Sequence, residues 1–126
     1  MNHISLSVPN VCGNEVKYVS ETLADGWISA VGPYVNKFEE VVAKYAKVEK
    51  TVAVASGSAG LHLSYLEAGV KQGDIVVCPA LTFIASINPI AYTKAEPYFI
   101  DVDDTLCISP DAFETFLNEK VGSVVL

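Results

Sequence analysis

Residues 51–103 read TVAVASGSAGLHLSYLEAGVKQGDIVVCPALTFIASINPIAYTKAEPYFIDVD, and in this stretch short apolar runs alternate with longer segments of helical periodicity. The apolar runs predict three buried strands, over Thr51–Ala55, Ile75–Cys78 and Pro97–Ile100. The segments between them predict helices over Ala59–Ala68 and Thr82–Tyr92. Strands and helices that alternate with short connections indicate an α/β fold with an open, mostly parallel sheet flanked by helices.

Two amphipathic helices are expected before this stretch, over residues 14–24 and 34–46, because apolar side chains recur there at helical spacing. Residues 1–13 predict an extended arm, and residues 27–33 predict an irregular loop between the two helices. We therefore expect residues 1–50 to form an arm and a surface layer of two helices.

After the stretch, an amphipathic helix is expected over Asp111–Glu119 and a strand over Gly122–Leu126. A parallel sheet is normally covered on both faces, and no helix follows this last run. We therefore expect residues 51–126 to be the first strands and helices of a larger sheet, so that the chain is an incomplete domain. The helix over Ala59–Ala68 is apolar nearly all round, so it is expected to be sandwiched between other elements.

Composition excludes several classes of protein. The chain has 126 residues, 51% of them hydrophobic, and a mean hydropathy of +0.35, which is too apolar for a disordered chain. All eight basic residues are lysines, and fifteen acidic residues bring the net charge to −7. Nucleic acid is therefore excluded as a partner, because binding it requires a basic surface.

Cysteine usage and hydropathy bear on the compartment. Cys12, Cys78 and Cys107 are odd in number and far apart, so neither a disulfide framework nor a metal site is expected. The N-terminus lacks the pattern of a signal peptide. Ile75–Thr93 carries no charge over 19 residues, but its two prolines do not suit a membrane-spanning helix. We expect a soluble, cytoplasmic protein with no membrane partner.

The turn between the first predicted strand and its helix, Ser56-Gly57-Ser58, is a candidate anion site. Backbone N–H groups at a helix start are unpaired and lie at the positive end of the helix dipole, so they bind phosphate without arginine. Gly57 permits close approach of a ligand, and the Ser58 hydroxyl adds a donor. The alternative is that Ser58 only caps the helix. The position favours a ligand, because open α/β sheets bind ligands beyond the carboxyl ends of their strands.

Other polar and aromatic residues follow the remaining strands. Phe83 comes after the second strand, where it could stack on a flat ring or pack in the core. Asp101, Asp103 and Asp104 follow the third strand and are interpreted as a solvated turn with capping roles. His62 lies in an apolar helix and is interpreted as a core histidine rather than a base or ligand.

Four motifs in order resemble a known family: GWISAVGPYVNKFEE (26–40), SGSAGLHL (56–63), GDIVVCPALTFIASINPIAY (73–92) and AEPYFIDVD (95–103). They are similar to the N-terminal part of the DegT/DnrJ/EryC1/StrS aminotransferases, pyridoxal-phosphate enzymes of fold type I that aminate keto-sugar nucleotides. LSVPNVCGNEVKYVSE (6–21) and DVDDTLCISPD (101–111) look most like the branch that makes 4-amino-4,6-dideoxy sugars for legionaminic acid and bacillosamine. The resemblance implies that residues 1–126 are the N-terminal portion of the cofactor-binding large domain.

The resemblance also implies roles for particular residues. The turn of Gly57, Ser58 and Ala59 would hold the cofactor phosphate, with serine where the family usually has threonine. Phe83 would stack on the pyridine ring.

Substrate-binding residues follow from the same resemblance. Trp27 and Ser29 would border the sugar-nucleotide site, and Asn88 would lie near the same crevice.

The family's Schiff-base lysine and the aspartate that pairs with the pyridine nitrogen are expected beyond residue 126. The lysine is needed to shuttle a proton, and the aspartate keeps the ring nitrogen protonated as an electron sink. The full-length protein is therefore expected to transfer an amino group from glutamate to a 4-keto-6-deoxy sugar on UDP, as a homodimer, in amino-sugar and surface-polysaccharide biosynthesis. This chain alone is expected to be inactive.

Two alternatives remain open. The chain is either a stand-alone, non-catalytic α/β module that binds a phosphorylated ligand, or part of a sugar 3-aminotransferase or dehydratase with the same fold. In such a dehydratase the lysine is replaced, so the residue that separates the reactions lies outside this sequence.

Overall fold

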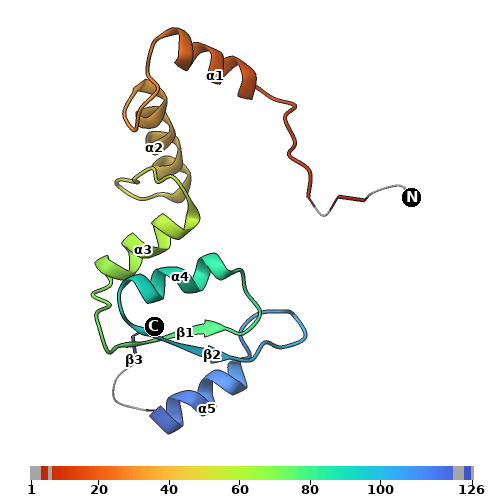
Figure 1. The fold of residues 1–126 in the computed structure, drawn as a ribbon, viewed down its shortest axis with the longest axis vertical. Coiled ribbons are helices and arrows are strands. Elements are labelled where there is room, and N and C mark those ends of the chain that lie inside the picture. Colours follow the sequence, from red (N-terminus) through yellow and green to blue (C-terminus); the bar gives the residue numbers. More distant parts are fainter. Residues whose placement is uncertain (1–3, 6, 121–123, 126) are drawn as a thin grey trace. The chain divides into compact units, whose positions relative to one another are not determined.

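The computed structural model describes residues 4–5, 7–120 and 124–125 (Figure 1). The chain falls into two compact units, an N-terminal unit, Met1–Ala53, and a C-terminal unit, Val54–Leu126. The boundary between them lies inside the run that the sequence predicts as the first strand.

The N-terminal unit contains two helices, α1 (Glu15–Ala24) and α2 (Pro33–Ala46). Both match the predicted helices to within one residue, since α1 begins one residue later than expected, at Glu15, and α2 begins one residue earlier, at Pro33. Proline suits a first helical position because its fixed φ is already helical and an N–H is not needed there. Lys47 ends α2 in the left-handed conformation, with φ 56°.

An aromatic cluster joins α1 to α2. The rings of Tyr18 and Tyr34 have centroids 5.3 Å apart, and the Lys37 ammonium lies 5.9 and 6.0 Å from the two centroids. The Tyr34 hydroxyl donates a hydrogen bond to the Glu21 carboxylate. This bond to a carboxylate raises the pKa of Tyr34 to about 12, because ionisation of the phenol would bring two negative charges together.

The C-terminal unit is built on a parallel sheet of β1 (Ile75–Pro79), β2 (Glu96–Ile100) and β3 (Val124–Val125). The strand order is β2-β1-β3, and Ile75 pairs with Glu96 in the register of β1 and β2. The predicted α/β class with a parallel sheet flanked by helices is confirmed.

The prediction of a strand over Thr51–Ala55 is wrong, since these residues form neither helix nor strand. A strand needs a neighbour to pair its backbone groups, and this segment bonds to a helix instead. The Thr51 hydroxyl donates to the Glu39 carbonyl, and the Ala53 N–H donates to the Glu39 carboxylate. Within the described residues the sheet therefore has three strands rather than the expected four.

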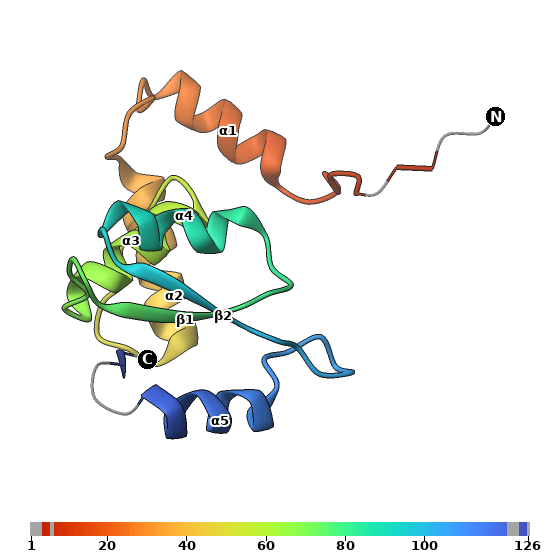
Figure 2. The ribbon, with the colours of Figure 1, turned by 60° about the horizontal axis from the view of Figure 1, so that its bottom comes forward.

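Three helices complete the C-terminal unit: α3 (Gly57–Glu67), α4 (Ile84–Tyr92) and α5 (Pro110–Lys120). α4 contacts β1 and β2 and packs against α3, while α5 lies on the opposite face of the sheet (Figure 2). The expectation that α3 is sandwiched is wrong. It packs against α4, but none of its residues is buried in this chain.

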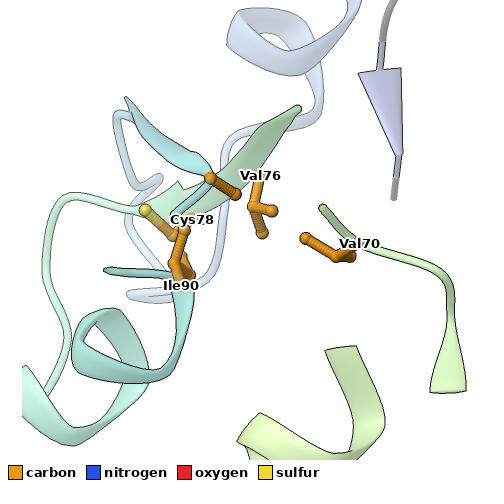
Figure 3. Packing of buried hydrophobic residues seen from close by; sticks show 5 residues of the cluster. Val70, Val76, Cys78 and Ile90 are labelled. Carbon is orange, nitrogen blue, oxygen red and sulfur yellow. The ribbon is translucent and has the colours of Figure 1, made fainter. Parts of the chain in front are cut away.

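The core of the C-terminal unit lies between β1 and α4 (Figure 3). Five buried residues form it: Val70, Val76, Cys78, Ile90 and Ala95. Ile90 is fully buried, and the apolar surroundings raise the pKa of the Cys78 thiol. This core therefore holds α4 against the sheet.

No helix of the described residues is long and apolar enough to cross a membrane, and the uncharged run 75–93 is divided between β1 and α4. The same part of the chain holds no group of three or more His, Cys, Asp or Glu side chains placed to bind a metal ion. Cys12 and Cys107 are exposed free thiols.

Candidate functional site

The start of α3 is shaped by Ser56. This residue is extended, with φ −161° and ψ 162°, and its hydroxyl accepts a hydrogen bond from the Ala59 N–H at 3.2 Å. Its carbonyl accepts from the Gly60 N–H at 3.1 Å. Ser56 is therefore the N-cap, and the alternative that Ser58 caps the helix is wrong. The helix begins at Gly57, earlier than the sequence predicts.

This cap leaves a defined set of donors at the turn. Within the described chain, the N–H groups of Gly57 and Ser58 donate to no protein acceptor, and the Ser58 hydroxyl adds a third donor. A carbon atom added to Gly57 would meet nothing within 4 Å, so the space beside the turn is open. These groups lie at the positive end of an 11-residue helix.

The donor set fits a phosphate group. A phosphate dianion needs several N–H or O–H donors and a favourable field, and the turn offers both without a cationic side chain. Ala59 differs from its two neighbours, because its N–H is already held by Ser56. Three residues are predicted to bind the phosphate. The N–H groups of Gly57 and Ser58 are free to do so, whereas the Ala59 N–H would first have to release the Ser56 hydroxyl.

Phe83 lies directly before α4, after the carboxyl end of β1. Its side chain is 76% exposed, so in this chain the alternative of core packing is wrong. Its carbonyl accepts from the Ser86 N–H at 2.8 Å, which ties its backbone to the first turn of α4. The Thr82 hydroxyl donates to the Ser86 hydroxyl at 3.2 Å. Phe83 therefore presents a free ring from an anchored backbone.

The phosphate-binding candidate and the aromatic candidate occupy the starts of two helices that pack together, α3 and α4 (Figure 1). Their relation to the sheet differs. Phe83 follows a strand of the sheet, whereas Ser56 follows an extended segment with no strand partner. Phe83 thus lies beyond the carboxyl end of a strand, where open α/β sheets bind ligands, and the turn does not.

Trp27 and Ser29 belong to the N-terminal unit, where they line one small hollow of about 100 Å³ in the loop between α1 and α2. The structure brings these two candidates together. A carbon added to Gly32, whose φ is +154°, would lie 3.1 Å from the Cβ of Trp27. Glycine is needed there to let the Trp27 side chain lie against the backbone. Asn88 is exposed on α4 in the C-terminal unit.

The acidic turn after β2 is solvated, as predicted. Asp103 accepts a hydrogen bond from the Thr105 N–H at 2.8 Å and another from the Thr105 hydroxyl, and these bonds lower the pKa of the Asp103 carboxyl. The cap of α5 comes from Ser109, whose hydroxyl accepts from the Ala112 N–H at 3.3 Å, and not from an aspartate.

His62 is half-buried rather than fully enclosed. Its ring meets the edge of Tyr92 at 5.5 Å between centroids, so it takes part in the packing of α3 on α4.

Sequence reasoning overlooked Glu39. The apolar spacing that predicts the helix over residues 34–46 assigns no role to Glu39. Helical spacing could have indicated a contact of Glu39, because this residue lies one turn before the buried Ala43 and away from Lys37 and Lys44 on the helix surface. Its two hydrogen bonds hold residues 51–53 of the N-terminal unit on α2.

Comparison with known proteins gives one family for nearly the whole chain: residues 10–126 match the DegT/DnrJ/EryC1/StrS aminotransferase family. Over 117 residues the chain is 46% identical to EpsN of Bacillus subtilis (strain 168), named as a pyridoxal phosphate-dependent aminotransferase, covering 92% of this chain and 30% of EpsN. It is 38% identical over 126 residues to GDP-perosamine synthase of Escherichia coli O157:H7, covering 99% of this chain and 35% of that protein. The chain thus spans about a third of the length of the curated relatives it matches.

Solved structures share the fold. Spr1654 of Streptococcus pneumoniae, named as a sugar aminotransferase and solved in its PLP form, matches with a TM-score of 0.80 at 33% identity, covering 90% of this chain and 29% of that one. GDP-4-keto-6-deoxy-D-mannose-3-dehydratase of E. coli, with bound hydrated PLP, matches with a TM-score of 0.78 at 25% identity, covering 98% and 32%. Proteins named for amination and for dehydration therefore resemble this chain.

Proposed function

The chain belongs to the DegT/DnrJ/EryC1/StrS aminotransferase family, and from this premise we propose that it is the cofactor-phosphate portion of a pyridoxal-phosphate-dependent sugar aminotransferase. One observation of the structure carries the proposal. The open donors of Gly57 and Ser58 and the free ring of Phe83 lie at the starts of two packed helices, α3 and α4.

Each group has a defined task. The amides of Gly57 and Ser58, with the Ser58 hydroxyl, bind the phosphate and so fix one end of the cofactor. Ala59 belongs to the same turn, and its N–H would join the donor set only by releasing the Ser56 hydroxyl. The Phe83 ring covers one face of the pyridine ring and holds its plane. When bound, pyridoxal phosphate supplies the electron sink for amino transfer.

Three further residues are proposed to bind the sugar nucleotide. Trp27 and Ser29 border the sugar nucleotide from the loop between α1 and α2, and Asn88 contributes from α4. The proton-shuttling lysine and the aspartate paired with the pyridine nitrogen belong to the rest of the full-length protein. The 126 residues alone are thus proposed to be inactive.

The proposed reaction moves an amino group from glutamate to a 4-keto-6-deoxy sugar nucleotide, in amino-sugar and surface-polysaccharide biosynthesis. UDP is the proposed carrier, within the branch for legionaminic acid and bacillosamine, and the full-length enzyme is proposed to act as a cytoplasmic homodimer. The name of the E. coli relative favours GDP as the competing carrier. A dehydratase is the second candidate function, because a solved dehydratase covers 98% of this chain with a TM-score of 0.78.

The site assignment is tested by cofactor affinity. In the full-length protein, Ser58→Ala combined with Phe83→Ala should raise the Kd for pyridoxal phosphate by about tenfold or more, because a phosphate donor and a stacking surface are lost together. Ser64→Ala is the matched control for the lost hydroxyl, since Ser64 is exposed on α3 and its hydroxyl donates to the Gly60 carbonyl, outside the site. An unchanged Kd in the double variant would show that the turn and Phe83 do not hold the cofactor.

The reaction is tested by supplying substrates in parallel. With glutamate as the donor, a UDP-linked 4-keto-6-deoxy sugar should gain an amino group while glutamate is converted to 2-oxoglutarate. Amination of the GDP-linked sugar instead would show that the nucleotide carrier is GDP and not UDP. Loss of a sugar hydroxyl without net amination would favour the dehydratase.

A further inference from the structure

The three helices of the C-terminal unit do not begin in the same way. α3 and α5 follow serines, Ser56 and Ser109, whose hydroxyls each accept a hydrogen bond from a backbone N–H of the first turn. α4 follows Phe83, whose side chain has no acceptor and makes no such bond. An aromatic residue is an unfavourable N-cap, and the Phe83 ring is 76% exposed, so it does not serve the core either. A residue that breaks a local rule without a packing reason indicates a functional position.

The residues on either side of Phe83 are linked across it. The Thr82 hydroxyl donates to the Ser86 hydroxyl at 3.2 Å, and the Ser86 N–H donates to the Phe83 carbonyl at 2.8 Å. Thr82 is exposed, and Ser86 is half-buried in the first turn of α4. Ser86 therefore binds both the backbone of Phe83 and the side chain of the residue before it.

The backbone around this link is held on both sides within the C-terminal unit. The Ala80 N–H donates to the Ile100 carbonyl at 2.8 Å, which fixes the end of β1 on β2. Ile90 is fully buried and holds α4 against the sheet (Figure 3). α4 has only nine residues, and Pro89 lacks the N–H that would bond to the Ala85 carbonyl. The first turn of α4 therefore depends strongly on the contacts at its own start.

The direction of the Phe83 ring follows from the backbone that carries it, because so exposed a side chain has few neighbours to fix it. This backbone is extended, with φ −78° and ψ 139°. A stacking surface binds best when its plane is fixed before the ligand arrives, since ordering it on binding costs free energy. Without the Thr82–Ser86 bond the turn samples more conformations, so the ring stacks less well.

We propose that Thr82 and Ser86 are positioning residues, which hold the Phe83 ring for stacking on the flat ring of the cofactor and do not touch the cofactor themselves. This inference rests on the proposed function, because it needs Phe83 to cover the pyridine ring. All three residues belong to the C-terminal unit, so the inference concerns that unit alone.

The test is the Kd for pyridoxal phosphate in the full-length protein, measured together with the melting temperature of the cofactor-free form. Thr82→Val removes the donor and Ser86→Ala the acceptor, and each should raise the Kd by about three- to tenfold, the effect of losing one hydrogen bond. Thr82→Ser keeps a hydroxyl and should stay within about twofold of wild type. Thr115→Val is the matched control, since this exposed threonine of α5 donates to the Asp111 carbonyl, and its Kd should not change.

Removing the ring separates a positioning role from a purely structural one. In a Phe83→Ala background, Thr82→Val should cause no further rise in the Kd, because the link then has no ring to hold. A further rise as large as in the wild-type background would overturn the proposal, since the hydroxyls would then act independently of Phe83. An unchanged Kd in Thr82→Val would also overturn it, whether or not the melting temperature falls. Thr82→Val decides alone if Ser86→Ala does not fold.

Failure of this proposal is distinguishable from failure of the proposed function. If Phe83→Ala raises the Kd and Thr82→Val does not, only the positioning role is lost. If Phe83→Ala leaves the Kd unchanged, the ring does not cover the cofactor, and both the assignment of Phe83 and this inference fail. If the wild-type protein does not bind pyridoxal phosphate at all, the proposed function fails as well.

Discussion

At the scale of single residues, Asp103 illustrates how local hydrogen bonds set the charge of a side chain in this molecule. The hydroxyl of Thr105 is the largest cause of its lowered pKa, and the N–H of the same residue adds to the effect. Both donors stabilise the ionised carboxylate, so folding favours loss of the proton. A carboxyl whose pKa is lower in the folded chain adds stability above its unfolded pKa of about 3.9, and this contribution disappears as the pH falls through the lower folded value.

Thr105→Val should therefore raise the pKa of Asp103 toward its ordinary value, while the remaining N–H bond keeps part of the shift. The measurement is a titration of the Asp103 carboxyl carbon by NMR. Thr115→Val is the control, because its hydroxyl bonds to the Asp111 carbonyl and not to Asp103. Identical titration curves in wild type and Thr105→Val would show that the hydroxyl does not hold the carboxylate.

The sequence predicted which short segment has the chemistry of an anion site, but not the part each residue plays in it. Ser56 and Ser58 are equally good caps by composition, and only the observed start of α3 at Gly57 decides between them. Glu39 was not predicted because its partners lie 12 and 14 positions further along the chain. A contact of that range depends on how a loop folds back, which residue spacing on a helix does not determine.

At the scale of secondary-structure elements, α4 is the element whose packing organises the C-terminal unit. Its Ile90 is fully buried against β1, and the same helix begins at the residue after Phe83. The packing that stabilises the unit therefore also fixes the position of the aromatic candidate.

Truncating Ile90 should follow the pattern of a close-packed core. Ile90→Val should lower the free energy of unfolding by about 0.5–1.5 kcal/mol and Ile90→Ala by about 2–5 kcal/mol, because each leaves a larger cavity. Urea denaturation of the full-length protein measures both. Losses within about 0.5 kcal/mol for both variants would mean that this cluster does not form the core.

Element prediction succeeded where the signal is local and failed where it is not. Amphipathic spacing and capping residues placed α1, α2, α4 and α5 within about two residues, because helices are held by bonds between near neighbours. The apolar run at Thr51–Ala55 has the composition of a strand, but a strand also needs a partner from a distant part of the chain. The described residues supply none, and Glu39 binds the run instead.

At the scale of the whole molecule, both units expose large apolar side chains. α1 has no buried residue, and Phe38 and Val41 of α2 are more than half exposed. In the C-terminal unit, Phe83 and Phe99 are exposed as well. Monomeric soluble proteins seldom leave extended apolar patches uncovered. The chain also spans about a third of the length of its relatives, which is the relation expected if further protein surface covers these side chains.

A polypeptide of these 126 residues alone should therefore self-associate and bind a hydrophobic dye such as ANS, whereas the full-length protein should do neither to a comparable extent. Light scattering and dye fluorescence at equal molar concentration measure the difference, and heating should give the short chain a broad transition, because its exposed apolar side chains favour association over cooperative unfolding. Phe38→Ser with Val41→Ser, on the exposed face of α2, should reduce the scattering of the short chain, since it removes apolar surface without touching the core. The opposite result is equally informative. A monomer that melts cooperatively and ignores the dye would be a self-sufficient α/β module, and the non-catalytic binding of a phosphorylated ligand would then become the better account of the turn at Ser56–Ser58.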